Sequence, residues 1–380
     1  MPVGATTAAV VLHHLVERRR TAPSEDWKRG AFGRFEKGDA VRVRGLDGLR
    51  ALAVMAVVFG HIGWIVARSG FLGVDVFFVL SGYLITTLLL REVDGTGTIR
   101  LGMFYARRAL RLYPALILAV LAAVLIPRAE TSNSAGWLSL TYVMDFARSF
   151  GWITDAHAGA LGVTWSLGIE EHFYLLWPLL LLALVPRVSR RALTWMAAGL
   201  ALASWGALVG VSIAASQPSI YYRPDLRVGG LFIGCLVALL PLARSRAVGR
   251  LAWAALAVLV FLLQVPSGRP SPTSTFAVRM PAVWALTALL IIAFATESAP
   301  RLGSFLSWWP IEYVGRISYG LYLYHLIVIQ VVSTYGLRFA VRMPLYLLLS
   351  IGVAALSFKL VERPFLRLKE RRFSRSEVAT

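Results

Sequence analysis

The chain has 380 residues, of which 57% are hydrophobic and 16% are charged. Soluble globular proteins are about a quarter charged, so this composition is too apolar for that class. Apolar runs of about 20 residues, the length of a helix that crosses a bilayer, recur along nearly the whole sequence. The sequence therefore predicts an all-α polytopic membrane protein and excludes a β-barrel, whose strands would appear as short alternating segments.

The net charge of +19 arises from 39 lysine and arginine residues against 20 acidic residues. The basic residues are scattered between the apolar runs, which argues against a nucleic-acid partner. Membrane proteins retain lysine and arginine in their cytoplasmic loops, and this topology signal explains the charge. The one cysteine, Cys235, excludes an intrachain disulfide and a cysteine metal site.

We predict about ten transmembrane helices. Their ranges, in chain order, are 46–68, 71–91, 109–127, 168–186, 192–214, 226–243, 251–266, 280–296, 317–335 and 344–362. With the N-terminus inside, roughly three quarters of the lysine and arginine residues fall on the inner side, which places both termini in the cytoplasm. The segment 137–150 contains Asp145 and Arg148, and it is better explained as a re-entrant segment, an interfacial segment or a short outer helix than as a further span.

Three parts are expected along the chain. Residues 1–44 form a basic cytoplasmic extension, residues 45–364 form the membrane domain, and residues 365–380 form a basic cytoplasmic tail. The tail has the composition of a segment that contacts anionic lipid headgroups. The cytoplasmic membrane of the cell is the expected location.

The first predicted span carries a stripe of ionisable residues. Arg50 and His61 are separated by about three helical turns, roughly 16 Å along the axis, and share one helix face with Asp47. An ionisable group inside a bilayer costs about 2.5–3.5 kcal/mol on insertion scales and is usually kept for a function. Because histidine exchanges protons near neutral pH, His61 is a candidate general base. A hydrogen bond inside the helix bundle is the structural alternative.

A second candidate site is the arginine-rich segment at the inner mouth of the third span. Arg108 and Arg111 are three residues apart and therefore lie on one helix face. Two cations at this spacing repel each other unless an anion lies between them, and guanidinium groups match the oxygens of a phosphate. The pair predicts a binding site for a phosphorylated donor on the cytoplasmic side. A topology anchor for lipid phosphate is the alternative.

A third group is formed by Glu170, Glu171 and His172, at the outer start of the fourth span. The two carboxylates are adjacent and so point in different directions. A metal site is disfavoured because no third ligand is apparent in the sequence. An interfacial helix start, with aromatic anchors on both sides, is the structural alternative.

Two further polar residues lie inside predicted spans, Asp75 in the second and His325 in the ninth. Each is explained equally well by a hydrogen bond between helices and by a catalytic role. The predicted depths place His61, Asp75 and Glu170 in the outer half of the membrane, opposite the arginines. This division suggests an anion site near the cytoplasmic side of the membrane and a proton-transfer centre in its outer half.

Six short segments of the chain form a set of motifs. They are 46–54 together with His61, 73–85, 107–114, 165–178, 318–325 and 361–364. Taken together and in this order, they resemble the bacterial acyltransferase family 3. Members of that family are polytopic membrane enzymes that O-acylate sugars and other hydroxyl-bearing compounds. The resemblance covers residues 46–364.

The resemblance implies roles for individual residues. It implies that Arg50 and His61 are the arginine and histidine of the family's first span, and that Arg108 and Arg111 are its arginine pair. The family's glutamate after Trp-Ser-Leu is matched by Glu170. The implied co-substrate is cytoplasmic acyl-CoA, with acetyl-CoA favoured, and no metal is implied.

The sequence departs from the family in three respects. The N-terminal extension is long, His172 stands where glutamine is common, and we expect no counterpart of the extracytoplasmic esterase-like domain that is fused to some members. The last difference leaves room for an extracytoplasmic partner.

The resulting hypothesis is an integral membrane O-acyltransferase that moves an acyl group to a hydroxyl of a carbohydrate, a cell-envelope glycan or lipid, or a secondary metabolite. The arginines would hold the CoA phosphates. His61 would deprotonate the acceptor directly, and an acyl-histidine intermediate is the less favoured variant. Either Glu170 or Asp75 would orient the imidazole as a catalytic partner.

Two other classes of protein stay open. A transporter or exporter would use the buried histidine and carboxylates as a proton relay, but it explains the inner arginines less well. A non-catalytic membrane scaffold would need none of these polar residues.

Overall fold

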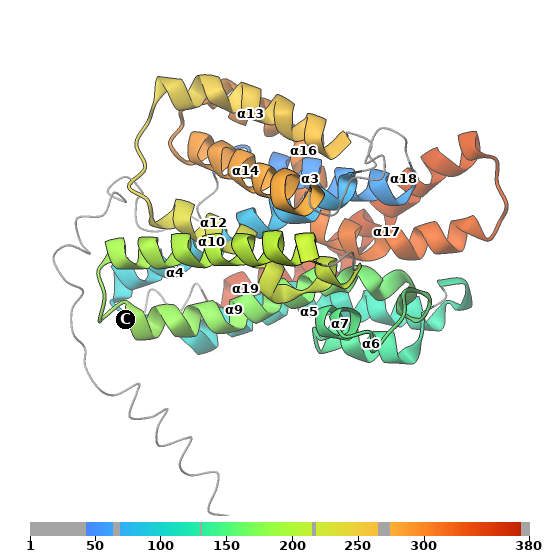
Figure 1. The fold of residues 1–380 in the computed structure, drawn as a ribbon. Coiled ribbons are helices and arrows are strands. Elements are labelled where there is room, and N and C mark those ends of the chain that lie inside the picture. Colours follow the sequence, from blue (N-terminus) through green and yellow to red (C-terminus); the bar gives the residue numbers. More distant parts are fainter. Residues whose placement is uncertain (1–42, 64–68, 130, 215–217, 265–273, 374–380) are drawn as a thin grey trace, which may run out of the picture.

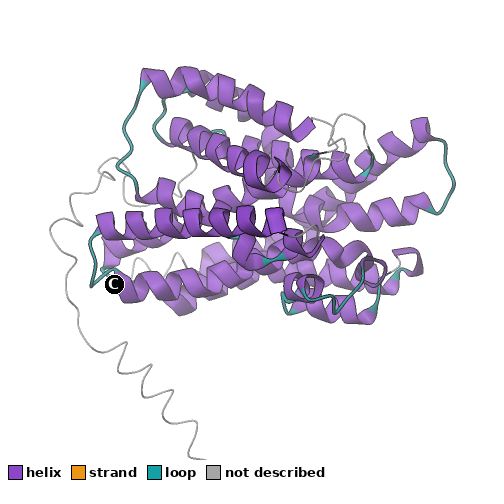
Figure 2. Cartoon of the chain, in the orientation of Figure 1, coloured by secondary structure: helices purple, strands orange, loops and turns teal. Residues whose placement is uncertain are grey.

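The computed structural model describes residues 43–63, 69–129, 131–214, 218–264 and 274–373. Every regular element in these residues is a helix, and none of them forms a strand (Figure 2). The all-α prediction is therefore confirmed for this part of the chain. The predicted N-terminal extension up to residue 42, and residues 374–380 of the predicted tail, lie outside the described residues.

Each predicted span contains a helix. In chain order these are α3 (Leu46–His61), α4 (Gly73–Thr96), α5 (Leu101–Leu125), α9 (Trp165–Leu184), α10 (Arg190–Ala214), α12 (Gly229–Leu239), α13 (Arg246–Gln264), α14 (Met280–Ala295), α17 (Ser318–Ser333) and α18 (Phe339–Ser357). Many of them run along a common direction, which is close to horizontal in Figure 1.

Shorter helical elements connect these helices. They are η2 (Gly70–Leu72), η3 (Pro127–Ala129), α6 (Asn133–Leu140), α7 (Met144–Ser149), α8 (Asp155–Ala158), η4 (Gly159–Thr164), η5 (Pro218–Tyr222), α11 (Pro224–Arg227), η6 (Ser274–Arg279), α15 (Pro300–Leu306), α16 (Trp309–Arg316), η7 (Phe358–Glu362) and α19 (Arg363–Phe373).

Seven helical segments of the described chain are long and apolar enough to cross a membrane. They are Gly70–Thr96, Leu101–Leu125, Asp155–Leu184, Arg190–Ile213, Arg246–Gln264, Ser274–Ala295 and Phe339–Leu368. The helices α3, α12 and α17 are shorter, with 16, 11 and 16 residues. Eleven residues rise only about 16 Å, roughly half the thickness of the hydrocarbon layer. A helix thus lies in each of the ten predicted ranges. That all ten helices cross the membrane completely stays a prediction.

The ambiguous segment 137–150 forms parts of two short helices, α6 and α7, which are separated by a turn. Ser132 caps the start of α6 by accepting a hydrogen bond from the backbone N–H of Ala135. At the turn, Tyr142 adopts a left-handed conformation with φ of 57°. Neither helix is long enough to span a bilayer, and both gather at one end of the long helices (Figure 1). This outcome agrees with the prediction of short helices instead of an eleventh span.

Helix α4 is the central helix of the bundle. About 78% of the most apolar 18-residue stretch of its segment is buried inside the protein. The buried share of the corresponding stretch is 44% or less in each of the other six candidate spans. It packs against α3, α9, α12 and α14. The outer helices, by contrast, expose rows of leucine, tryptophan and phenylalanine side chains, as expected for surfaces that face lipid.

Helix α3 is held by close backbone contacts at both ends. A Cβ atom added at Gly315 of α16 would lie 1.8 Å from the carbonyl oxygen of Asp47. At the other end, a Cβ atom added at Gly70 would lie 1.9 Å from the carbonyl oxygen of Ala56. Small residues allow helices in membranes to approach this closely. The position of α3 in the bundle is therefore fixed independently at each end.

We expect Gly315→Ala to lower the stability of the protein, because the added methyl group must push α16 away from α3. Overpacking of this kind costs about 1–3 kcal/mol. The measurement is the temperature of unfolding in detergent. Gly206→Ala on α10 is the matched control, since a Cβ atom at Gly206 meets no atom within 4 Å. Equal unfolding temperatures for both variants would contradict the tight contact between α3 and α16.

Candidate active site

Helix α3 carries two candidate site residues at its opposite ends. Arg50 lies in its first turns and donates a hydrogen bond of 2.9 Å to Asp47 Oδ1. His61 is the last residue of the helix. The continuous helix confirms the predicted spacing of about three turns, which corresponds to roughly 16 Å along the axis.

His61 contacts a second histidine, His325 of α17. Nδ1 of His61 lies 3.3 Å from Nε2 of His325, and the two ring centroids are 5.0 Å apart. His325 is fully buried, whereas His61 is exposed to a cavity that it lines. Each histidine is recognisable in the sequence as a polar residue in an apolar span, but no spacing along the chain could bring residues 61 and 325 together.

The hydrogen-bond partners define the tautomer of both rings. Nδ1 of His61 lies 2.9 Å from the carbonyl oxygen of Val57, and Nδ1 of His325 lies 2.7 Å from that of Tyr322. Because a carbonyl oxygen can only accept, each Nδ1 carries the proton in the neutral ring. The Nε2 atom of His61 is then unprotonated, which is the form that a general base requires.

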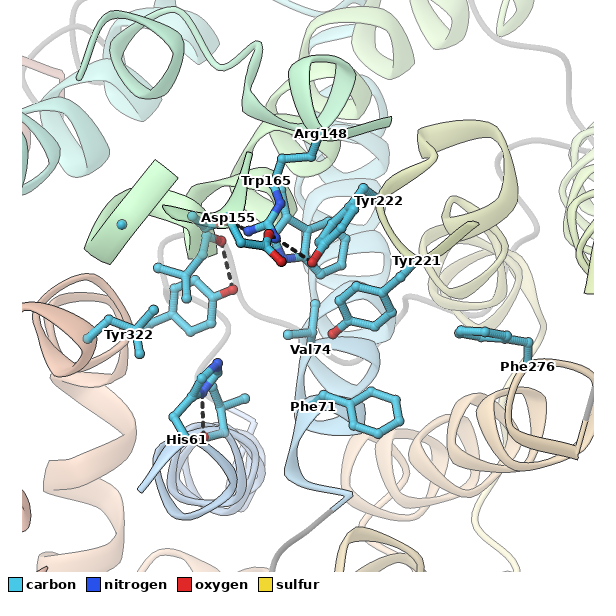
Figure 3. A pocket seen from close by; sticks show the side chains of 15 residues that line it. His61, Phe71, Val74, Arg148, Asp155, Trp165, Tyr221, Tyr222, Phe276 and Tyr322 are labelled. Atoms are coloured by element: carbon cyan, nitrogen blue, oxygen red, sulfur yellow. Dashed lines mark hydrogen bonds and ion pairs between the residues drawn. The ribbon is translucent and has the colours of Figure 1, made fainter. Parts of the chain in front are cut away.

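The cavity beside His61 has a volume of about 640 Å³. His61 lies on one side of it, while Arg148 and Asp155 lie on the opposite side (Figure 3). Its aromatic lining consists of Phe71, Trp165, Tyr221, Tyr222, Phe276 and Tyr322. Cavities of this size bind small molecules, and aromatic walls with a few polar groups are typical of such sites.

The polar side of the cavity is built by Arg148 of α7. Its guanidinium group pairs with Asp155, donates to the hydroxyl of Tyr222 at 2.5 Å and lies 3.9 Å from the centroid of that ring. Burial raises the pKa values of Tyr221 and Tyr222, although the charge of Arg148 partly opposes this for Tyr222. Both phenols therefore stay protonated at neutral pH. This group was not predicted, since in the sequence Arg148 is only a charge that interrupts an apolar segment.

Asp75 does not contact His61. Its carboxylate accepts hydrogen bonds from Arg227 at 3.1 Å and from the indole N–H of Trp284 at 2.8 Å, and both charged residues are fully buried. The expectation that Asp75 orients the imidazole is therefore corrected, because its oxygens face Arg227 and α14. Similar depth in the membrane does not place two residues on facing sides of their helices.

Glu170 lies with the arginines instead of with His61. Its two carboxylate oxygens accept hydrogen bonds from Ser81 at 3.2 Å and from Tyr174 at 2.9 Å. The ring of Tyr174 in turn lies under the guanidinium group of Arg108, at 3.6 Å. This corrects both the expectation that Glu170 orients His61 and the predicted depth of Glu170 beside that residue. A part for Glu170 or Asp75 in the reaction stays a prediction.

The three arginines predicted to bind an anion converge. Arg111 interacts electrostatically with Arg50 and Arg108, although the three residues come from two different helices. Asp47 pairs with Arg50, and Glu171 lies 3.9 Å from Arg108. Glu170 and Glu362 are further acidic neighbours, since Glu170 interacts electrostatically with Arg50 and Arg108, and Glu362 with Arg111. The Nε atom of Arg108 is buried and makes no hydrogen bond within the described residues. A phosphate oxygen would satisfy this donor, so the cluster fits a phosphorylated ligand.

No group of three or more histidine, cysteine, aspartate or glutamate side chains that could hold a metal ion occurs in the described part of the chain. The one histidine in the third predicted group, His172, lies 3.3 Å from Asp145 of α7. This pair lies between helices α7 and α9 and contributes no lining residue to the cavity.

The helical bundle therefore places a cluster of three arginines at one end of α3 and a candidate base in a cavity at the other. A family model described as an acyltransferase domain matches residues 43–361. The chain belongs to the acyltransferase 3 family, and the resemblance seen in its six segments is confirmed. No solved structure gives a significant match to the chain.

The curated relatives are longer proteins. The O-acetyltransferase OatA of Staphylococcus aureus strain NCTC 8325 is 31% identical over 364 residues, which are 88% of this chain and 59% of that protein. Another S. aureus protein, from strain COL, is provisionally named as an O-acetyltransferase and is 29% identical over 356 residues, 85% of this chain and 57% of that protein. The chain thus spans less than two thirds of the length of these relatives. Family and apolar helices together define a multi-pass membrane protein.

We expect Asp75→Asn to reduce stability, because Arg227 would remain buried without a counter-charge. Removing one partner of a buried ion pair costs about 3–5 kcal/mol. The measurement is the free energy of unfolding in detergent. Asp225→Asn is the matched control, since its pair with Arg223 is exposed and should contribute little. Full stability together with lost acyl transfer in Asp75→Asn would contradict the structural role and support the predicted catalytic one.

Proposed function

We propose that this protein is an integral membrane O-acyltransferase. It moves an acyl group, preferably acetyl, from cytoplasmic acyl-CoA to a hydroxyl of a carbohydrate, a cell-envelope glycan or lipid, or a secondary metabolite. The observation that carries the proposal is the arrangement of α3. Arg50 joins the arginine cluster at one end of this helix, and His61 faces the cavity at the other. The proposed location is the cytoplasmic membrane, with ten spans and both termini inside.

The arginine cluster would bind the phosphate groups of CoA. Guanidinium groups bind phosphate in a two-point geometry. The buried Nε–H group of Arg108 has no hydrogen-bond acceptor among the described residues, and a phosphate oxygen would supply one. The acyl thioester lies at the end of a long flexible arm in CoA. An anion site roughly 16 Å from His61 therefore suits a donor whose reactive carbon is distant from its phosphates.

The proposed reaction needs one base. Nε2 of His61 takes the proton of the acceptor hydroxyl while the hydroxyl oxygen attacks the thioester carbonyl carbon. The new C–O ester bond forms, the C–S bond breaks, and the CoA thiolate leaves with the electron pair. The protonated histidine then returns its proton to the thiolate, so that atoms and charges balance. Direct transfer is the proposed variant. An acyl-histidine intermediate, in which the same lone pair of Nε2 attacks the thioester carbon, is the less favoured variant.

The cavity would hold the acceptor. Its aromatic walls provide surfaces on which sugar or macrocycle rings can pack, and Arg148 with Asp155 supplies donors and acceptors for hydroxyl groups. The relatives carry the name O-acetyltransferase, which favours acetyl as the transferred group. An extracytoplasmic protein that receives the acyl group is the other acceptor that the proposal allows.

The alternative of a proton-coupled exporter receives less support. A relay would need the buried histidine and carboxylates to follow one another in contact. Within the described residues, Asp75 is bound to Arg227 and Glu170 is bound to Ser81 and Tyr174, whereas His61 contacts His325. These separate pairings favour the enzyme.

We expect His61→Ala to reduce acyl transfer by at least about 100-fold, because general-base catalysis contributes about 10²–10⁴-fold. The measurement is transfer of label from acetyl-CoA into the glycan and lipid fractions of membranes that contain equal amounts of folded protein. The control is His157→Ala, which removes an exposed histidine of α8 that contacts Thr154. Wild-type transfer by His61→Ala would refute the proposed function, and movement of unmodified solute would support the exporter.

We expect Arg108→Gln and Arg111→Gln each to raise the KM for acyl-CoA by about 10- to 100-fold with a smaller change in kcat. Loss of one charge-assisted hydrogen bond is worth about 1.5–3 kcal/mol. Arg107→Gln on the same helix is the matched control, because Arg107 points to Glu92 at 3.6 Å. An unchanged KM in both cluster variants would show that the arginines do not bind the donor.

A further inference from the structure

We infer that His325 is a positioning residue for His61. It holds the imidazole with Nε2 directed into the cavity and accepts the Nδ1–H hydrogen bond of His61 when that ring becomes charged. This inference rests on the proposed function of His61 as a general base. His325 thus takes the orienting role that was predicted for Asp75 or Glu170.

The surroundings of His325 leave it one free nitrogen. Its Nδ1–H group donates to the carbonyl oxygen of Tyr322 at 2.7 Å, and the backbone of Leu321 lies within hydrogen-bonding reach as well. Since neutral histidine carries one N–H, its Nε2 atom has a lone pair. This lone pair faces Nδ1 of His61 at 3.3 Å. The hydrogen bond to Tyr322 in its own helix therefore leaves Nε2 of His325 as an acceptor.

A second contact is needed because His61 ends its helix. The other acceptor for Nδ1–H is the carbonyl oxygen of Val57, which belongs to the last turn of the same helix at 2.9 Å. The chain leaves the helix directly after His61, through Ile62 and then Gly63 with a φ of 73°. A partner on α17 connects the ring to a second helix of the bundle, whereas Val57 belongs to the same helix as His61.

Helix α17 also builds the wall of the cavity. Tyr322 lies one turn before His325 and lines the cavity, and its hydroxyl donates to the carbonyl oxygen of Val163 at 2.9 Å. The same hydroxyl is 2.7 Å from Ser166 Oγ. One face of α17 therefore sets both the cavity wall and the partner of His61. Their relative positions are fixed by a single helix.

A neutral partner suits this site. When Nε2 of His61 takes a proton, the ring becomes a cation, and an acceptor at Nδ1–H stabilises it. In serine proteases a buried carboxylate accepts the corresponding hydrogen bond from the catalytic histidine. A neutral histidine supplies the lone pair without adding a negative charge beside the thioester carbonyl, where negative charge develops in the transition state.

Three substitutions separate hydrogen bonding from packing. His325→Gln can place an amide oxygen near the position of Nε2 and retain an acceptor for His61. His325→Asn is shorter, so it can still donate to the carbonyl of Tyr322 but offers His61 no acceptor. His325→Phe keeps the ring and removes both nitrogens. Each variant is compared as the full chain in membranes, and the rate is divided by the amount of folded protein.

We expect His325→Asn and His325→Phe to lower kcat on the order of 100-fold, with the KM for acetyl-CoA unchanged. His325→Gln should restore kcat to within about 10-fold of the wild type. Tyr324→Phe is the matched control on α17, because it removes a buried hydrogen bond to Ser357 that lies apart from His61. This control should lower the unfolding temperature and leave kcat unchanged.

The outcomes are separable. Wild-type kcat in His325→Asn and His325→Phe, with His61→Ala inactive, would overturn this inference and leave the proposed function standing. An active His61→Ala protein would overturn both. Equal loss of kcat in the Gln, Asn and Phe variants would also overturn the inference, because a role in packing alone predicts no rescue by glutamine.

Discussion

The backbone geometry of helix α3 is the constraint on which the rest of the site depends. Its hydrogen bonds fix the rise from Arg50 to His61 at roughly 16 Å, and close contacts with Gly315 and Gly70 hold the helix at both ends. A cationic anion-binding cluster and an imidazole base would impair each other if they were adjacent, because nearby cations disfavour protonation of the imidazole. The helix separates Arg50 from His61 while keeping both on one face, which is the spacing that the proposed donor requires.

The pairing of buried charges then determines which polar groups are free to react. A charge in a low-dielectric interior must find a partner, and each carboxylate predicted for the catalytic centre has one. Asp75 is bound to Arg227 and Trp284, and Glu170 accepts from Ser81 and Tyr174. His61 is left with neutral partners only, so its Nε2 atom keeps an available lone pair beside the cavity.

The cavity depends on the irregular part of the chain. Arg148, Asp155, Tyr221 and Tyr222 come from the short helical elements α7, α8 and η5. Irregular backbone within a membrane protein is tolerated where it is buried in protein or lines a cavity, because its N–H and C=O groups can find partners there. The long helices thus supply His61 and the arginine cluster, whereas the short segments contribute much of the lining of the cavity that is proposed to hold the acceptor.

The sequence by itself determined the features that depend on local periodicity. The apolar runs located ten helices, the three-turn spacing placed Arg50 and His61 on one face, and the spacing of Arg108 and Arg111 indicated an anion site. The six motif segments also identified the family, which the family match to residues 43–361 confirmed. Only the tertiary structure decided which residues meet across helices. The pairing of His61 with His325, the separation of Asp75 and Glu170 from that pair, and the cavity group around Arg148 all depend on helix rotation and on turns between helices. Residues far apart in the chain meet through packing, and the period of a single helix does not specify which neighbour its polar face contacts.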